Sequence, residues 1–426
     1  MGRAMNTAAA VTAAVVNRSA QKKVRRRADK INQANRNVAN LGRVFSDQLI
    51  PCNTQMGNIC ISGGTDQVRA ALLVQNCRQS VSIGVPTIIL HEGNSALEQA
   101  LRQNFSGHRY MRIVNRSDPY YEPVFRLSDD GLARMIVEAS LPEQRIGPAG
   151  MPYLKAVSLI LRKKGITPYI RMLASCPHHA LAGLILQLES AGVIEERVSD
   201  SMRNDIEAGS AALPAIKCFF SQLDLESDIL AWKSRLSRCT SIAECIKMNG
   251  ILCLDLTSCA KKAQMSLIAA EIEESSKAGV PFRIIIYAVS IAENEKLVKV
   301  LKTASGSLAW TISCPDLNRM TGAAPGELAA WLALSHRAVL FSHGVQACRL
   351  LSAELGEYDH IDVVQSQAGN SSIGQLGFHF GTNAGLSTSN KRERVFKPED
   401  IEGLADKEFI LLDNYNASLG RGVLTV

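Results

Sequence analysis

The sequence lacks the short motifs that mark several classes of enzyme and membrane protein. Its 426 residues contain no G-x-S-x-G, no H-E-x-x-H, no G-x-G-x-x-G and no pair of carboxylates at a spacing typical of acid–base catalysis. These absences argue against a serine hydrolase, a zinc peptidase and a dinucleotide-binding oxidoreductase. No run of about 18 apolar residues occurs, so the sequence predicts neither a transmembrane helix nor a signal peptide.

Cysteine is present but lacks the spacing of a disulfide framework or a metal site. The 11 cysteines include no C-x-x-C pair and no Cys/His quartet at zinc-ligand spacing. This pattern favours free, mostly buried thiols in a reducing cytoplasm. His178 and His179 are adjacent but have no partner ligands nearby in the sequence, which favours a place on a helix surface. The sequence therefore predicts no metal site.

Outside a single N-terminal segment, the sequence has no large excess of positive over negative charge. The net charge of +7 is modest, and much of it comes from residues 18–45. Val24, Ile31, Val38 and Phe45 recur every seven residues there, which predicts one apolar seam along a basic helix. Such a helix could pack on its own domain, dock on a neighbouring subunit, lie on an anionic membrane or touch nucleic acid. The predicted nucleic-acid or membrane contacts are Lys22, Lys23, Arg25, Arg26, Arg27 and Lys30.

The most informative stretch is a glycine turn at residues 58–73, NICISGGTDQVRAALL. Ile59–Ile61 predicts a short buried strand, Gly63 and Gly64 predict a tight turn, and a helix is expected from near Gln67. This is the order of a P-loop, in which backbone N–H groups and a helix N-terminus converge on phosphate. An ordinary strand-to-helix turn of an α/β domain has the same pattern, so the turn alone does not decide between them.

The rest of the chain reads as an α/β domain interrupted by helices. Apolar strands alternate with helices at the spacing of βαβ units over residues 49–127 and again over 249–426. Over 128–248, apolar residues recur at helical spacing, and one of the expected helices is Ser227–Leu236. Residues 360–390 read as a long loop or a turn-rich hairpin region. The predicted domains are a basic N-terminal helix or tail (1–48), one α/β domain (49–127 and 249–426) and an inserted all-α domain (128–248).

This order of pieces resembles the TraG/TraD-type coupling proteins of conjugative, type IV secretion systems, in the wider FtsK/HerA-like class of hexameric DNA-pumping P-loop ATPases. Ile61–Ala70 stands where the family has its phosphate loop, and Ile251–Asp255 resembles the Walker B strand. Residues 350–356 and 392–412 are similar to the family's C-terminal signature. The resemblance implies a RecA-like α/β fold with a mostly parallel central sheet and an inserted all-α domain. The family's N-terminal transmembrane pair is missing from this sequence.

The resemblance also shows where the sequence departs from a working ATPase. Val68 replaces a glycine of the loop, Arg69 replaces its lysine, and Ala70 lacks the hydroxyl that would hold Mg²⁺. Leu256 follows Asp255 where a catalytic Glu would stand, Tyr287 and Ser290 occur where the family has Gln, and Ser275–Lys277 replaces the region of the arginine finger. Loss of a general base alone costs roughly 10²–10⁴-fold in rate, and loss of an arginine finger about 10³–10⁵-fold. A vestigial nucleotide site would comprise Gly63, Gly64, Thr65, Asp66, Gln67, Val68, Arg69 and Asp255.

Three interpretations follow. The first is a degenerate coupling-ATPase homologue without a cofactor or catalytic residues, which serves as a structural or docking ring component for DNA or protein in a transfer or secretion-like assembly. The second is an active hexameric DNA translocase with an atypical P-loop that uses ATP and Mg²⁺. The third is a protein-only scaffold that binds neither nucleotide nor DNA. The expected partners are further copies or a paralogue in a hexamer-type ring, DNA, and secretion or conjugation proteins, in the cytoplasm or peripherally at the inner face of the membrane.

Overall fold

The computed structural model describes residues 2–50, 57–231, 237–257, 262–303, 306–322, 326–374 and 377–425. Its strands are β1 (Val38–Phe45), β2 (Ile59–Ser62), β3 (Thr87–His91), β4 (Met111–Val114), β5 (Ile251–Asp255), β6 (Phe282–Tyr287), β7 (Leu308–Cys314), β8 (Arg337–Leu340), β9 (Glu357–Gly374), β10 (Gly377–Arg394), β11 (Glu408–Asp413) and β12 (Ser418–Thr425). Ten of them form one sheet in the order β1-β12-β11-β8-β2-β7-β6-β3-β5-β4. All neighbours from β8 to β4 are parallel, β11 is antiparallel to both β8 and β12, and β1 is parallel to β12. The predicted α/β class with a mostly parallel central sheet is confirmed.

Some of the helices cover both faces of this sheet. The α-helices of the described residues are α1 (Gly2–Arg36), α2 (Ser46–Leu49), α3 (Asp66–Ser82), α4 (Ser95–Phe105), α5 (Asp129–Ala139), α6 (Gly150–Lys163), α7 (Ile170–Ser175), α8 (His178–Ser190), α9 (Glu196–Gly209), α10 (Leu213–Glu226), α11 (Ile242–Lys247), α12 (Lys262–Ser276), α13 (Glu295–Lys302), α14 (Leu317–Thr321), α15 (Glu327–Leu334), α16 (Val345–Glu354) and α17 (Pro398–Glu402). On β3, Ile88 and Leu90 share a hydrophobic cluster with α12 and α13, whereas Ile89 belongs to the cluster with α3 and α4. A strand buried on both faces needs apolar residues at every position, which explains the continuous apolar runs.

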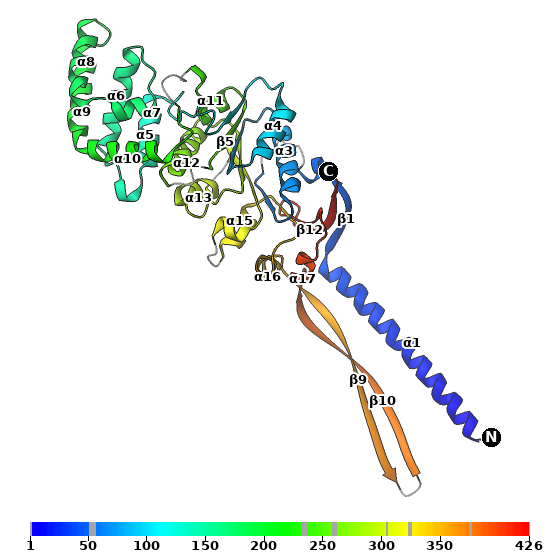
Figure 1. Cartoon of the computed structure of the whole chain (residues 1–426). Coiled ribbons are helices and arrows are strands. Elements are labelled where there is room, and N and C mark those ends of the chain that lie inside the picture. Colours follow the sequence, from blue (N-terminus) through cyan, green and yellow to red (C-terminus); the bar gives the residue numbers. More distant parts are fainter. Residues whose placement is uncertain are drawn as a thin grey trace.

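Between β4 and β5 the chain passes through α5 to α11, which stack at one end of the sheet (Figure 1). The first of these helices, α5, begins at Ser128, whose hydroxyl accepts a hydrogen bond from the N–H of Gly131 at 3.1 Å. The predicted helix Ser227–Leu236 is wrong over residues 227–231. There α10 has already ended at Glu226, and Leu230 instead forms a β-bridge with Tyr121. Residues 232–236 lie outside the described residues.

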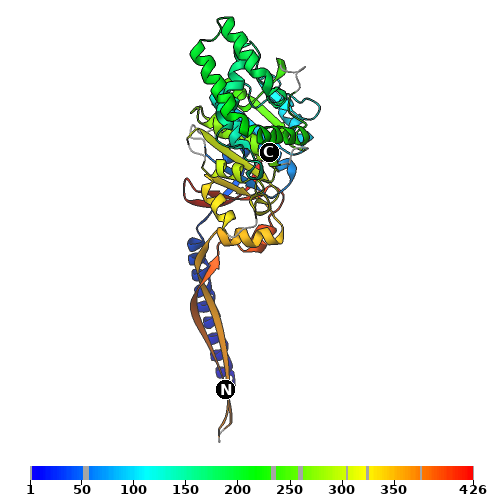
Figure 2. The same cartoon turned by 90° about the vertical axis from the view of Figure 1, so that its left-hand side faces the viewer.

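The opposite end of the molecule carries an arm made of α1 and the β9–β10 hairpin (Figures 1 and 2). The amide of Asn32 joins the two, because its Nδ2 donates to the carbonyl of Ile361 at 3.0 Å and its Oδ1 accepts from the N–H of Ile361 at 2.7 Å. Asn35 adds a hydrogen bond from Nδ2 to the carbonyl of Asp359 at 2.8 Å. Of the two alternatives for residues 360–390, the structure has the hairpin. Among the described residues, no helix combines the length and apolar content needed to cross a membrane.

The single apolar seam predicted for the N-terminal helix is wrong. Val24 and Ile31 lie on α1, but the helix ends at Arg36, and Val38 and Phe45 belong to the edge strand β1. Asn37 causes the break, because its φ of 45° is left-handed and ends the helix. The segment after it, β1, adds an edge strand to the main sheet beside β12.

Candidate functional site at the glycine turn

The turn between β2 and α3 is closed by hydrogen bonds to neighbouring strands. Gly63 and Gly64 have φ values of 79° and 65°, in the left-handed region that favours glycine. The N–H of Gly63 donates to the carbonyl of Cys314 at 3.1 Å, and the N–H of Gly64 donates to the carbonyl of Ser342 at 2.9 Å. Phosphate loops bind their ligand with backbone N–H groups that have no other acceptor. In this turn both glycine N–H groups already have one.

There is little free space around Gly63. A Cβ on Gly63 would lie 2.5 Å from the carbonyl oxygen of Ser342 and 2.6 Å from Nδ1 of His343. His343 is itself held in place, since its Nε2 lies 2.8 Å from the hydroxyl of Ser62 and its Nδ1 lies 2.5 Å from the carbonyl of Phe341. Burial lowers the pKa of His343, so the ring stays neutral around pH 7. At Gly63 the turn is therefore packed against the chain that follows β8, whereas a cavity of about 320 Å³ remains on its other side, next to Gly64, Thr65 and Val68.

Two amides in the first turn of α3 have acceptors on Thr65. Thr65 is the N-cap, and its hydroxyl accepts from the N–H of Val68 at 3.4 Å while its carbonyl accepts from the N–H of Arg69 at 3.2 Å. The side chain of Val68 is buried in the cluster between α3 and the sheet. Gln67 points into solvent. These contacts are those of an ordinary capped helix.

Arg69 turns back into the glycine turn instead of facing a ligand. The residue is 3% exposed, its Nη1 donates to the carbonyls of Gly63 and Gly64 at 2.9 and 2.7 Å, and its Nη2 donates to Oδ1 of Asp66 at 3.0 Å. The guanidinium therefore holds the turn together from the inside.

Asp66 places a carboxylate at the N-terminus of α3. Its Oδ1 accepts from the Tyr287 hydroxyl as well as from Arg69, and its Oδ2 accepts from Nδ2 of Asn94 at 3.0 Å. Partial burial alone would raise the pKa of Asp66, but the hydrogen bonds from Tyr287 and Asn94 and the charge of Arg69 together lower it. Burial, followed by the contact with Asp66, raises the pKa of Tyr287. The chain itself thus supplies the negative charge that a helix N-terminus attracts.

The topology explains why these side chains meet. β6 and β3 are neighbours in the sheet. After β6 the chain continues to β7 on one side of this pair, and after β3 it continues to β4 on the other side, so the direction of the connections reverses between β6 and β3. In open α/β sheets such a point forms a crevice outside the carboxyl ends of the strands, where ligands bind. Here Tyr287 from the end of β6, Asn94 from the loop after β3, and Asp66 fill the crevice.

Asp255 contacts the same loop as Asp66, although β5 lies four strand positions from β2. Oδ1 of Asp255 accepts from the N–H groups of Gly93 and Thr257 at 2.9 and 3.0 Å and from the Thr257 hydroxyl. Gly93 directly precedes Asn94, whose side chain donates to Asp66. Burial would raise the pKa of Asp255, but the bonds to Oδ1 lower it. Asp255 therefore caps the loop after β3, and the two carboxylates hold neighbouring residues of that loop.

His91, at the end of β3, lies between the carboxylate of Glu98 on α4 and that of Asp255 at the end of β5. Its Nε2 is 3.6 Å from Oε1 of Glu98, and its Nδ1 is 4.0 Å from Oδ1 of Asp255. Because the carboxylates face opposite ring nitrogens, they do not converge on one ion. Within the described ranges, no three His, Cys, Asp or Glu side chains gather as metal ligands.

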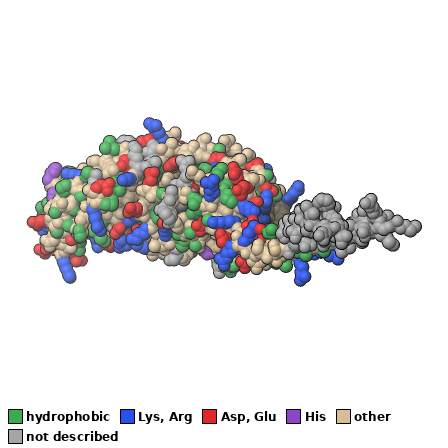
Figure 3. Space-filling model, turned by 90° about the horizontal axis from the view of Figure 1, so that it is seen from below, with side chains coloured by type: hydrophobic (Ala, Val, Ile, Leu, Met, Phe, Trp, Pro, Cys, Tyr) green, Lys and Arg blue, Asp and Glu red, His purple; other side chains and the backbone are tan. Residues whose placement is uncertain are grey.

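The six predicted basic contacts lie on α1, away from the glycine turn, and all six are exposed (Figure 1). On the face of the molecule shown in Figure 3, Lys and Arg are interspersed with Asp and Glu, without a field of one sign. Sequence reasoning missed the partnership of Asp66 with Tyr287 and Asn94, and also the part of His343. The available signals were Tyr287 at a strand end and His343 just after the strand next to β2.

No family model matches the sequence, and no curated protein matches it. Its fold is similar to that of solved conjugative coupling proteins. The bacterial conjugative coupling protein TrwBΔN70, in its unbound monoclinic form, is 15% identical, with 93% of this chain and 91% of that chain covered and a TM-score of 0.49. The plasmid coupling protein TrwB in complex with the GTP analogue GDPNP is 15% identical, with 93% and 92% covered and a TM-score of 0.48. VirB4 of Thermoanaerobacter pseudethanolicus is 11% identical, with 70% and 80% covered and a TM-score of 0.34.

Proposed function

We propose that this protein is a non-hydrolysing relative of the conjugative coupling ATPases that serves as a structural or docking component of a transfer assembly. The order of the sequence segments supports the relation to coupling proteins. The closed glycine turn supports the loss of hydrolysis, and the bonds of Arg69 to the carbonyls of Gly63 and Gly64 are the observation that carries the proposal.

The residues at the turn do not fit ATP and Mg²⁺. A triphosphate would have to displace the N–H groups of Gly63 and Gly64 from their acceptors and approach the carboxylate of Asp66. A buried donor or acceptor left without a partner costs about 1–3 kcal/mol, so opening the turn is expensive. Ala70 offers no hydroxyl to the metal, and Oδ1 of Asp255 already accepts hydrogen bonds from Gly93 and Thr257.

The proposed role is one of assembly. The ring would contain further copies of this chain or an active paralogue, and it would receive DNA or protein as cargo. The exposed cations of α1 would contact nucleic-acid phosphates, without reading sequence. These residues are Lys22, Lys23, Arg25, Arg26, Arg27 and Lys30.

Equilibrium dialysis with radiolabelled ATP and Mg²⁺ tests the closed turn. We expect no saturable binding at the turn below about 1 mM and no turnover above background, with or without DNA. The variant Arg69→Ala is the control for the position of any binding. Binding that disappears in Arg69→Ala, or turnover stimulated by DNA, would contradict the proposal and favour the active translocase.

DNA binding measured at two salt concentrations separates a nucleic-acid docking component from a protein-only scaffold. If all six cations of α1 contact phosphates of a single strand, affinity should fall roughly 10²–10³-fold between 50 and 200 mM salt. Replacing Lys22, Lys23, Arg26 and Lys30 with Gln should reduce this slope. A chain that binds no DNA at 50 mM salt would be the scaffold.

A further inference from the structure

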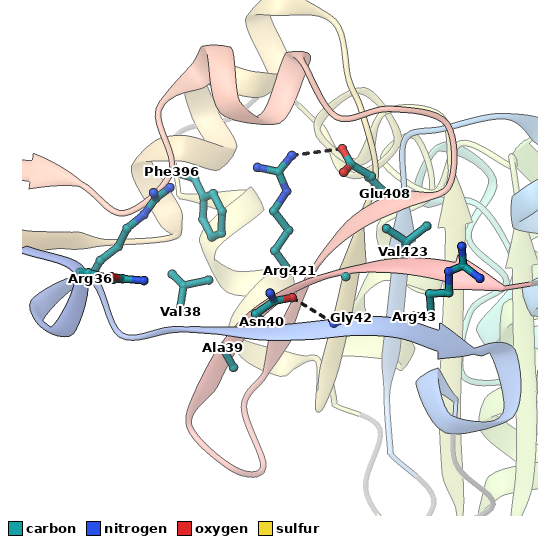
Figure 4. Close-up of a pocket in the computed structure, with 12 residues that line it drawn as sticks. Arg36, Val38, Ala39, Asn40, Gly42, Arg43, Phe396, Glu408, Arg421 and Val423 are labelled. Carbon is teal, nitrogen blue, oxygen red and sulfur yellow. Dashed lines mark hydrogen bonds and ion pairs between the residues drawn. The ribbon is translucent and has the colours of Figure 1, made fainter. Parts of the chain in front are cut away.

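A cavity lies at the base of the arm, far along the sheet from β3 and β5. It has a volume of about 510 Å³, within the usual range for small-ligand sites. The end of α1, the edge strand β1, strand β12 and the loop before α17 surround it (Figure 4). We call it the β1–β12 pocket. The residues that matter here are Arg36, Asn40, Arg43, Phe396, Glu408 and Arg421.

A β-bulge aims Arg43 into this pocket. In the parallel pairing of β1 with β12, Asn40 lies opposite Arg421 and Arg43 lies opposite Val423, with the register shifted between Asn40 and Gly42. Arg421 and Val423 are two residues apart and share one face of β12. Without the extra residue, Gly42 rather than Arg43 would face that side. Bulges commonly redirect a side chain in this way, and the left-handed φ of 62° at Gly42 makes the shift possible.

The arginines of β1 and β12 keep much of their hydrogen-bonding capacity. Arg421 uses Nη2 for a bond of 3.1 Å to Oε2 of Glu408, and Arg43 has no hydrogen bond or ion pair within the described part of the chain. Figure 4 shows both side chains rising from the two strands on the same side. A guanidinium carries five N–H donors, so most of those on Arg43 and Arg421 face the cavity or solvent.

Arg36 bounds the pocket at its other end in a rigid position. Its Nε donates to the carbonyl of Val395 at 2.6 Å, its Nη2 to Asp400 at 3.2 Å, and its guanidinium lies 5.0 Å from the centre of the Phe396 ring. Three arginines thus line a cavity in which Glu408 is the only lining acid among the described residues. The local charge is positive.

We propose that the β1–β12 pocket binds a phosphate-bearing anion. Guanidinium groups recognise phosphate through several directed, charge-assisted hydrogen bonds, and an anion here would take up the donors of Arg43 and Arg421. This site is separate from the glycine turn and shares no residue with it. The proposal goes beyond the proposed function and fails or stands independently of the ATP test.

The same chemistry has two possible sources. One is a free diphosphate or phosphorylated metabolite. The other is the backbone of a nucleic acid lying along α1, because Arg26, Lys30 and Gln33 follow at i, i+4 and i+7 on one helix face and Gln33 lines the pocket. The experiment therefore uses one probe for each source.

Titration calorimetry of the full chain with inorganic pyrophosphate, and fluorescence anisotropy with a short labelled oligo-dT, test the site. The variant is Arg43→Gln, which removes one exposed positive charge. The matched control is Arg109→Gln, an exposed arginine beside β4 at the opposite edge of the sheet. For whichever probe the wild type binds, we expect Arg43→Gln to raise the dissociation constant at least about tenfold and Arg109→Gln to leave it unchanged.

Binding of pyrophosphate that depends on Arg43 supports the site with a free phosphate as ligand. Binding of oligo-dT alone that depends on Arg43 supports it with a nucleic-acid backbone as ligand. The proposal is overturned if neither probe binds up to millimolar concentration, or if Arg43→Gln binds as the wild type does. Equal urea midpoints for the wild type and Arg43→Gln would show that the variant is folded.

Discussion

The glycine turn and the β1–β12 pocket contain similar residues, but the arginines differ in what they contact. Each combines a glycine of left-handed φ with an arginine, Gly63 with Arg69 and Gly42 with Arg43. At the turn the guanidinium is buried and bonded to the chain's own carbonyls, whereas at the pocket it is exposed and faces an open cavity. An arginine near a glycine can bind a ligand only where its N–H donors are not already bonded to the protein's own carbonyl groups.

The largest difference should come from adding a methyl group to each glycine. Gly63→Ala places a Cβ 2.5 Å from the Ser342 carbonyl at a φ of 79°, whereas Gly42→Ala meets nothing within 4 Å. We expect Gly63→Ala to lose more than about 3 kcal/mol of unfolding free energy, and Gly42→Ala to lose only about 1–2 kcal/mol of backbone strain. Urea denaturation of both variants measures this. Equal losses would mean that the turn is not packed as described.

Removing each arginine should give the next largest contrast. Arg69→Ala leaves the carbonyls of Gly63 and Gly64 without their donor, and we expect a loss of about 2–4 kcal/mol. Arg43→Ala should change the free energy of unfolding by less than about 0.5 kcal/mol, because the side chain is exposed. The two urea curves, measured in parallel, provide the check. A stable Arg69→Ala protein would show that the turn does not depend on the guanidinium.

The sequence allowed the strands of the parallel sheet to be predicted, because strands buried on both faces are continuously apolar. β2 and β5 are such strands, and their positions agree with the strands expected at Ile59–Ile61 and Ile251–Asp255. The edge strand β1 could not be predicted in this way. Its pairing with β12 is a contact between the two ends of the chain, and its half-exposed residues continue the period of the preceding helix.

At the candidate site, too, features that depend on neighbouring residues could be predicted from the sequence, and contacts between residues far apart in the chain could not. The departures from a P-loop at Val68, Arg69 and Ala70 are local and can be read from the sequence. The contact of Asp255 with Gly93 joins residues 162 positions apart, and the partnership of Asp66 with Tyr287 joins residues 221 positions apart. Sequence spacing carries no information on either.

The smallest effect concerns the hydroxyl of Tyr287 and is expected to depend on pH. Tyr287→Phe removes one hydrogen bond to Asp66, whose side chain is 58% exposed, so we expect a loss of only about 1 kcal/mol at pH 7. The pKa of Asp66 is lowered in the folded state. Its contribution to stability is therefore present above the unfolded pKa of about 3.9 and is lost as the pH falls through the folded value.

Because Tyr287→Phe moves the folded pKa of Asp66 back up, the stability gap between the wild type and the variant should narrow below about pH 4. Other carboxylates titrate in both proteins and cancel in the difference. Tyr415→Phe makes the same chemical change at a tyrosine that is 67% exposed, and it should leave no gap at any pH. Urea denaturation between pH 7 and pH 3 measures both gaps. A gap for Tyr287→Phe that stays constant to pH 3 would mean that the hydroxyl stabilises the turn through packing and not through the charge of Asp66, which would remove the carboxylate from the explanation of why the turn is closed.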